Sequence, residues 1–292
     1  MPSLLSDPVR KALRLKSEHG LTGTASGRPV ARGQGWLTQD VICNSGPRDR
    51  PFEERHDWVS VAVVLSGSFT YGNPLGRALL TPGALLLGSA EDCFTCGHEH
   101  GEGDRCLAFH FEPSYFENIA AAAGVRTMRF NHNNLPALRS MAPLVARAAV
   151  AADAGAPFEE LALELAEAVL LEGGEFRSPR ISKRDEQRVA AVVRHMEERF
   201  DQPCPLEDLA RLAGLSPFHF LRVFRAAIGL TPHQHLLRTR LRAAAANLVR
   251  SDMPVTEVAL AVGFEDLSNF TRSFRAEYRL SPLQYRRASV TR

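Results

Sequence analysis

Residues 210–226 read ARLAGLSPFHFLRVFRA and residues 259–276 read ALAVGFEDLSNFTRSFRA, so the last third of the chain contains one pattern twice. In both copies a glycine, Gly214 or Gly263, precedes a Phe-x-Arg-x-Phe-Arg-Ala block. The second copy has one more residue between its glycine and its block. Self-similarity of this kind indicates two structural units of one design.

Each copy has the pattern of a helix, a tight turn and a second helix. Gly214 and Gly263 allow the left-handed backbone that ends a helix. Ser216 is expected to cap the second helix of the first copy, with Pro217 in the first helical position, and Asp266 is the expected cap in the second copy. Apolar side chains at helical spacing are expected to face the core. These are Phe220, Val223, Phe224 and Ala227 in the first copy, and Phe270, Phe274 and Ala276 or Tyr278 in the second.

The polar and basic residues on these second helices suit a DNA major groove. A helix-turn-helix places its second helix in the groove, where Arg can bond guanine, Asn can bond adenine and a Thr methyl can touch thymine. The alternative is an ordinary solvated helix surface, and the duplication favours DNA reading. A further helix is predicted from Thr231, its cap, to Arg250. Its length would be roughly 28 Å, close to the roughly 34 Å between successive major-groove faces, so one monomer is expected to read two adjacent grooves.

The C-terminal sequence resembles the DNA-binding domain of the AraC/XylS family of bacterial transcription regulators. The resemblance covers about residues 183–288, and its matching stretches are residues 206–210, 216–220, 258–264, 269–275 and 281–286. It implies that base or phosphate contacts come from both second helices. The implied contacts are Phe218, Leu221 and Arg222 in the first helix, and Leu267, Ser268, Asn269, Thr271 and Arg272 in the second.

Two positions depart from the family pattern. Leu221 stands where family members more often have a polar residue, so the first reading helix is expected to touch thymine methyls or to contribute little to sequence reading. Arg279 stands where a glycine is usual, as Gly229 is in the first copy. A left-handed backbone at Arg279 would cost about 1 kcal/mol.

Charge is divided unevenly along the chain. Residues 181–292 carry 18 Lys and Arg against 12 Asp and Glu, whereas residues 1–180 carry 17 against 21. A basic C-terminal part suits a phosphate backbone. Arginine supplies 17 of those 18 cations. Its planar fork suits phosphate and guanine, although a GC-rich genome produces the same bias.

A chain of 292 residues is expected to form about two domains. The sequence has no apolar stretch of membrane-spanning length and no secretion signal, so we expect a cytoplasmic protein. Five cysteines, an odd number, argue against a disulfide framework. The predicted divisions are a partly ordered segment (1–33), a barrel (34–115), helices (116–172), a linker (173–182) and a DNA-binding domain (183–292) with helix-turn-helix units at about 206–228 and 255–278.

The N-terminal part is predicted to be rich in β-strands. Short apolar runs punctuated by Gly, Pro and Asn occur at residues 58–65, 67–71, 77–80, 84–87 and 106–111. About residues 35–115 resemble a cupin barrel, the usual sensor domain of this regulator family, which implies that the barrel binds a small-molecule effector. The predicted fold class is therefore α+β. It combines a cupin-like β-barrel or jelly roll with following helices and an all-α, homeodomain-like tandem helix-turn-helix domain.

Many cupins are metalloenzymes, so their ligand pattern is a test of enzyme function. The resemblance puts Glu54, His56, Ser60 and Leu87 at the usual ligand positions. Only His56 is a clear match, Glu54 is a possible ligand, and Leu87 cannot bind a metal. We therefore predict no enzyme activity, and a cupin metalloenzyme fused to a DNA-targeting domain is kept as an alternative.

Cysteines and histidines gather in one segment of the barrel. If residues 94–100 form a strand, Cys96, His98 and His100 project to one face, and a hairpin loop at residues 101–104 would return Cys106 beside them. Thiolate and imidazole ligands suit zinc, the one cofactor that the sequence suggests. Buried core cysteines beside a polar strand face are the alternative interpretation, and a redox role for the thiols is a third.

Residues 116–172 have helical periodicity. One apolar stripe includes Leu138, Met141 and Val145, and another includes Leu161 and Leu165. In the family such helices often dimerise, and they could equally cover one face of the barrel.

The predicted function is that of a sequence-specific transcription regulator, and the family resemblance implies an activator. The expected partners are double-stranded DNA, a small-molecule effector, a second copy of the chain and RNA polymerase, with no membrane. A regulator that senses metal or thiol oxidation through Cys96, His98, His100 and Cys106 is the second alternative.

Overall fold

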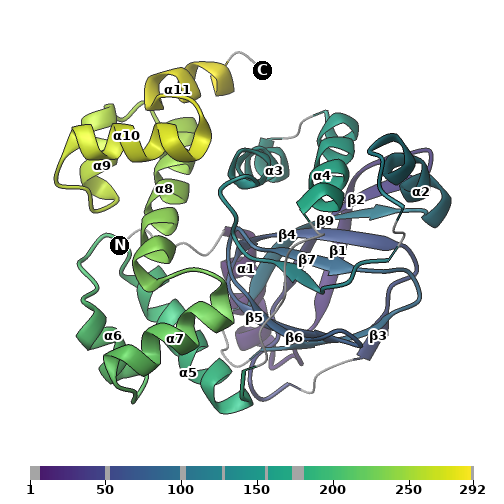
Figure 1. Ribbon diagram of the computed structural model, residues 1–292, viewed down its shortest axis with the longest axis horizontal. Helices are drawn as coiled ribbons and strands as arrows, with labels where there is room; N and C mark the ends of the chain where they lie inside the picture. The colour runs from purple at the N-terminus through teal and green to yellow at the C-terminus, as the bar shows by residue number, and fades with distance from the viewer. Residues whose placement is uncertain are drawn as a thin grey trace.

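The computed structural model describes residues 7–49, 53–98, 103–126, 129–154, 157–172 and 181–290 (Figure 1). Its N-terminal part begins with helix α1 (Asp7–His19) and continues as antiparallel strands. The strands are β1 (Ala25–Gly33), β2 (Trp36–Cys43), β3 (Glu53–Arg55), β4 (Val59–Ser66), β5 (Phe69–Asn73), β6 (Gly76–Leu80), β7 (Leu85–Gly88), β8 (Cys93–Gly97), β9 (Asp104–Phe111) and β10 (Asn134–Leu135).

These strands form two sheets that face each other. One has the order β1-β2-β9-β4-β7-β10, and the other has the order β3-β8-β5-β6. Side chains alternate between the two faces of a strand. On β9, Cys106 and Ala108 therefore belong to the apolar cluster between the sheets, whereas Leu107 and Phe109 belong to the cluster on the opposite face.

Three helices cover that opposite face of the six-stranded sheet (Figure 1). They are α2 (Pro113–Ala122), α3 (Ala142–Ala154) and α4 (Phe158–Glu172). A buried ion pair lies on the same face. The guanidinium of Arg105 donates to both carboxylate oxygens of Asp40, at 2.8 and 3.1 Å, and to Asp153 at the end of α3, at 2.7 Å. Arg105 therefore links two strands to a covering helix.

The C-terminal part consists of helices. They are α5 (Lys183–Glu198), α6 (Leu206–Leu212), α7 (Pro217–Ile228), α8 (Pro232–Arg250), α9 (Val255–Ala261), α10 (Leu267–Tyr278) and α11 (Pro282–Val290). Figure 1 shows α8 joining the α6–α7 pair at one end to α9, α10 and α11 at the other. Phe220, Phe224, Phe270, Phe274 and Tyr278 are buried in one cluster, as their helical spacing predicts.

The two parts of the chain pack against each other. Leu79 of β6 and Ala137 are buried in the apolar cluster of the C-terminal helices. α7 contacts β6, and α10 contacts α3. The buried carboxylate of Glu277 in α10 lies 3.5 Å from the guanidinium of Arg139, which precedes α3, and 3.3 Å from that of Arg238 in α8. An acidic group on α10 is therefore held by charges from both parts.

Several elements differ from the sequence predictions. β1 pairs with β2, so the sheet begins before the predicted barrel boundary at residue 34 and much of segment 1–33 is regular. β10 adds a strand within the predicted helical range 116–172. β8 and β9 belong to different sheets, so the predicted hairpin between them is wrong. Most of the predicted linker, residues 173–180, lies outside the described residues.

None of the helices in the described ranges is long and apolar enough to cross a membrane.

Candidate nucleic-acid interface

Helix α7 presents the first predicted reading surface. The hydroxyl of Ser216 caps it by accepting a backbone hydrogen bond, and Pro217 occupies its first turn, as predicted. Phe218 is 81% exposed, Arg222 is exposed and Leu221 is half-buried. A phenylalanine so exposed contributes little to the packing of this chain. Its ring is therefore available for contact with a partner.

Helix α10 presents the second predicted reading surface. Asp266 is its cap, as predicted, and its carboxylate accepts hydrogen bonds from the backbone N–H groups of Ser268 and Asn269, at 2.9 and 3.1 Å. This capping provides acceptors for backbone N–H groups in the first turn, which have no hydrogen-bond partner within the helix. Of the predicted contacts on α10, Leu267, Ser268, Asn269 and Arg272 are exposed and Thr271 is half-buried.

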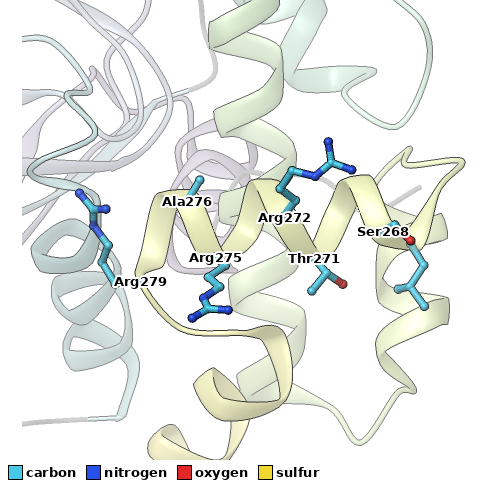
Figure 2. Close-up of a pocket in the computed structure, with 7 residues that line it drawn as sticks. Ser268, Thr271, Arg272, Arg275, Ala276 and Arg279 are labelled. Atoms are coloured by element: carbon cyan, nitrogen blue, oxygen red, sulfur yellow. The ribbon is translucent and has the colours of Figure 1, made fainter.

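The outer face of α10 lines a hollow of about 900 Å³. Its lining residues are Leu267, Ser268, Thr271, Arg272, Arg275, Ala276 and Arg279. Figure 2 shows three guanidinium groups, from Arg272, Arg275 and Arg279, distributed along the helix and its end. Of the predicted contacts on this helix, only Asn269 does not line the hollow. Arg275 and Arg279 were absent from the predicted contacts, although their helical spacing from Ser268 and Arg272 places them on this face.

Arg279 ends α10 in the left-handed conformation. Its φ is 63°, and Gly229 ends α7 with a φ of 76°. The two copies therefore use the same helix ending with different residues. For a residue with a side chain this conformation costs about 1 kcal/mol. The arginine therefore adds positive charge at the end of the reading surface at some expense in stability.

Helix α8 sets the separation of the two reading helices. Thr231 and Gln234 form a reciprocal capping box at its start, and Pro232 occupies the first turn. The helix has 19 residues. At 1.5 Å per residue it is about 28 Å long, close to one turn of duplex DNA.

The positions aligned with cupin metal ligands do not converge. Leu87 faces the covering helices, and Glu54 is exposed on β3. His56 is buried between the sheets, where its Nε2 lies 2.8 Å from the hydroxyl of Tyr71. Burial lowers the pKa of His56 to about 4, so its ring is neutral at pH 7. Ser60 instead contacts the Nδ1 of His110, at 2.9 Å.

The predicted cysteine and histidine cluster is arranged differently from the prediction. Cys106 belongs to the apolar cluster between the sheets, and Cys96 packs against that cluster. His100 lies outside the described residues. Within the described ranges, the ligand atoms that come within 4.8 Å of one another belong to Cys43, His98 and Asp104. Cys43 and Asp104 were not among the predicted ligands. The strand pairing that places them together is a long-range feature.

The side chains of this cluster are electrostatically coupled. The Nε2 of His98 lies 2.7 Å from a carboxylate oxygen of Asp104. Burial alone would lower the pKa of His98, but hydrogen bonds with Asp104 and Cys43 raise it to about 10. Burial also raises the pKa of the Cys96 and Cys106 thiols, and the nearby Asp104 carboxylate raises it further. Burial also raises the pKa of Asp104, while His98 opposes that shift, so the two side chains hold a proton between them.

Two capped helices that expose polar and basic side chains, held apart by a third helix, define a DNA-binding protein of the tandem helix-turn-helix class. Residues 209–288 match a family model described as a helix-turn-helix domain. The chain is also 32% identical to the transposon Tn10 TetD protein of Escherichia coli over 96 residues, which make up 33% of this chain and 70% of TetD. The chain belongs to the AraC/XylS family of transcription regulators.

Other relatives also match about a third of this chain. The chain is 40% identical over 83 residues to an uncharacterized HTH-type transcriptional regulator of Haemophilus influenzae, a match that covers 28% of each protein. It is 34% identical to the DNA-binding domain of AdpA, a global transcriptional factor solved in complex with a target DNA, and covers 94% of that domain and 36% of this chain with a TM-score of 0.35. The match spans between 28% and 38% of the length of the first three curated relatives.

Proposed function

We propose that this protein binds specific duplex DNA sequences through α7 and α10 and thereby regulates transcription, as an activator. The observation that carries the proposal is the outer face of α10, where three arginines line one hollow beside Ser268 and Thr271. Arginine forks suit both guanine edges and phosphates, and short polar side chains allow close approach to bases.

The experiment is to mix the purified full-length protein with sheared genomic DNA from its source and to sequence the bound fragments. The expected result is enrichment of a few sites, each with two conserved elements about one helical turn apart. Binding that falls with salt and favours no sequence would contradict a sequence-specific regulator.

Replacing Arg272 with alanine is expected to weaken binding to the enriched site by about 1–3 kcal/mol, or about 5- to 150-fold, and to relax the preference at one base pair. The physical reason is the loss of a forked hydrogen bond to a base edge. Binding isotherms on the site and on single-base variants measure both effects. The matched control is Arg211→Ala, because Arg211 is 77% exposed on α6 and does not line the α10 hollow. An equal loss on every sequence would assign Arg272 to a phosphate.

We further propose that the two facing sheets, from β1 to β10, form a cupin-like sensor barrel covered by α2, α3 and α4, and that the DNA-binding domain spans about residues 183–292 as the sequence predicts. Buried polar groups between the sheets support a small-molecule effector there. They include His56, Tyr71 and Ser60, and half-buried His110 contacts Ser60. Burial lowers the pKa of His110 to about 4, so both histidines are neutral at pH 7 and each can offer one donor and one acceptor.

The contact between Arg139 and Glu277 supports a route from the sensor to the second reading helix. Glu277 lies on the buried side of α10, opposite the hollow, so the contact orients the helix without covering its reading surface. An effector that changed the packing of α3 would move α10 directly. This is a differential contact of the kind that allosteric coupling requires.

Reversing the charge with Arg139→Glu is expected to loosen this contact, because it places a second carboxylate beside buried Glu277. Faster hydrogen exchange is expected in α3 and in the C-terminal half of α10, measured by mass spectrometry on the full chain. Arg10→Glu is the control. The side chain of Arg10 is exposed to a similar extent as that of Arg139, and it pairs with Asp7 on α1, which is distant in sequence from both α3 and α10. Unchanged exchange in α10 would rule out the proposed route.

Pairing of two copies through α4 is also proposed. Leu163 and Leu171 of α4 are 38% and 61% exposed, and a hollow of about 370 Å³ lies beside Leu163 between α2 and α4. Apolar side chains exposed in this way favour an interaction surface. Sedimentation of the full chain measures the oligomeric state, and a monomer at all concentrations would contradict the pairing. Contact with RNA polymerase is the further expectation for an activator.

A further inference from the structure

Three potential metal ligands meet at one end of the space between the two sheets. Cys43 is the last residue of β2, and it pairs in register with Asp104, the first residue of β9. His98 directly follows β8, which belongs to the other sheet. The thiol, the imidazole and the carboxylate each offer an atom within 4.8 Å of the others. The cluster therefore joins the two sheets through side chains alone.

The burial of this cluster is unusual for groups of this polarity. Cys43 and Asp104 are each 4% exposed as whole residues, and the His98 side chain is 5% exposed. A buried carboxylate loses its hydration, and a single imidazole recovers only part of that loss. A cation bound by all three side chains would offset the hydration that these groups lose on burial.

Two further thiols interact electrostatically with Asp104 and Cys43, although they do not belong to the group of ligand atoms that lie within 4.8 Å of one another. Cys96 is two residues before His98, and Cys106 is two residues after Asp104, so each shares a strand face with one of them. Both contribute to the apolar cluster between the sheets. Three of the five cysteines of the chain, Cys43, Cys96 and Cys106, therefore lie in the region between the sheets that contains this carboxylate and this imidazole.

We propose that Cys43, His98 and Asp104 bind one zinc ion between the sheets, and that the thiolate of Cys96 or Cys106 is the fourth ligand. Sulfur, nitrogen and oxygen donors in a closed tetrahedral set suit a structural zinc site. Zinc binding would release to solvent the proton shared by His98 and Asp104 and the protons of the two ligating thiols, with no change in oxidation state. This ligand set shares His98 and one of the thiols Cys96 and Cys106 with the set predicted from sequence, and it adds Cys43 and Asp104.

The test measures bound metal in the tag-free, full-length protein by mass spectrometry. About one zinc per chain is expected in the wild type, and the loss of that zinc is expected in Cys43→Ser and His98→Ala. Cys93→Ser and Cys204→Ser are the matched controls and should retain it, because Cys93 is exposed on the same strand as Cys96 and Cys204 precedes α6 in the C-terminal part. A wild type without zinc, or zinc retained in both ligand variants, would overturn the proposal.

A second measurement avoids dependence on variants that fail to fold. Metal-stripped, reduced wild type is titrated with cobalt, which takes zinc sites and gives sulfur-to-metal charge-transfer absorption only when a thiolate is bound. Saturation at one equivalent with this absorption supports the site. The absorption should weaken in either Cys96→Ser or Cys106→Ser, and no change in either would overturn the fourth ligand. Absence of uptake, with a disulfide forming among these cysteines on mild oxidation, would identify a redox pair instead.

This proposal is independent of the proposed DNA-binding function. None of its ligands lies in the C-terminal helices, so a zinc-free protein that still enriches specific DNA sites would overturn the metal site alone.

Discussion

Replacing Phe274 with alanine is expected to lower the free energy of unfolding by about 3–5 kcal/mol. The ring is fully buried, and its centroid lies 5.6 Å from Phe270, 4.7 Å from Tyr278 and 5.4 Å from Tyr285. Its removal leaves a cavity among rings on α10 and α11 that cannot close without moving both helices. Denaturant unfolding followed by circular dichroism measures the loss. DNA affinity should fall with it, because α10 depends on this packing for its orientation.

Phe218→Ala is the matched control, because it removes the same ring from an exposed position. Phe218 is 81% exposed, so its replacement should change stability by no more than about 0.5 kcal/mol. If Phe218 contacts DNA as proposed, affinity falls while stability does not. Equal stability losses in both variants would contradict the packing described for Phe274.

Replacing Arg105 with methionine is expected to destabilise the N-terminal part by about 3–5 kcal/mol, because it leaves the Asp40 carboxylate buried without its principal partner. The side chains of Arg105 and Asp40 are 4% and 3% exposed. Arg105 also donates to the carbonyl of Ala152, at 3.1 Å, so its loss also opens the end of α3. Thermal unfolding of the full chain measures the effect.

The double variant Asp40→Asn with Arg105→Met should recover part of that stability, because it removes the unpaired charge as well. Arg28→Met is the single-site control. Arg28 also approaches Asp40, at 3.4 Å, but its side chain is 71% exposed, so its loss should cost at most about 1 kcal/mol. Similar losses in Arg28→Met and Arg105→Met would show that burial of the pair is not the cause.

The C-terminal helices could be predicted from sequence because their signals are local. The duplicated block, the caps at Ser216, Thr231 and Asp266, and the spacing of the buried phenylalanines all lie within a few residues of the feature that they determine. Local agreement of capping, turn chemistry and apolar spacing specifies such helices strongly. The structure confirms these helix starts, and it shows a left-handed backbone at Arg279, where the sequence alone indicated only the cost of such a conformation.

The N-terminal part was less predictable because its structure depends on pairing between distant segments. β1 contains no strong apolar alternation and is a strand because β2 lies beside it. Cys43 meets Asp104 only through the β2–β9 register, across some sixty residues of sequence that no local pattern spans. The contact of Arg139 with Glu277 joins the two parts of the chain in the same way. The most polar buried groups were thus the hardest to foresee.

Helix α8 fixes the distance between the two helix-turn-helix units. It is continuous and is capped at its start, so it cannot stretch to accommodate a longer interval between the two groove segments. Half a turn of additional duplex between the two DNA elements would rotate one of them to the far side of the DNA, away from its helix. A base substitution within either element would leave their spacing unchanged. Natural sites for one chain should therefore vary in sequence far more than in spacing.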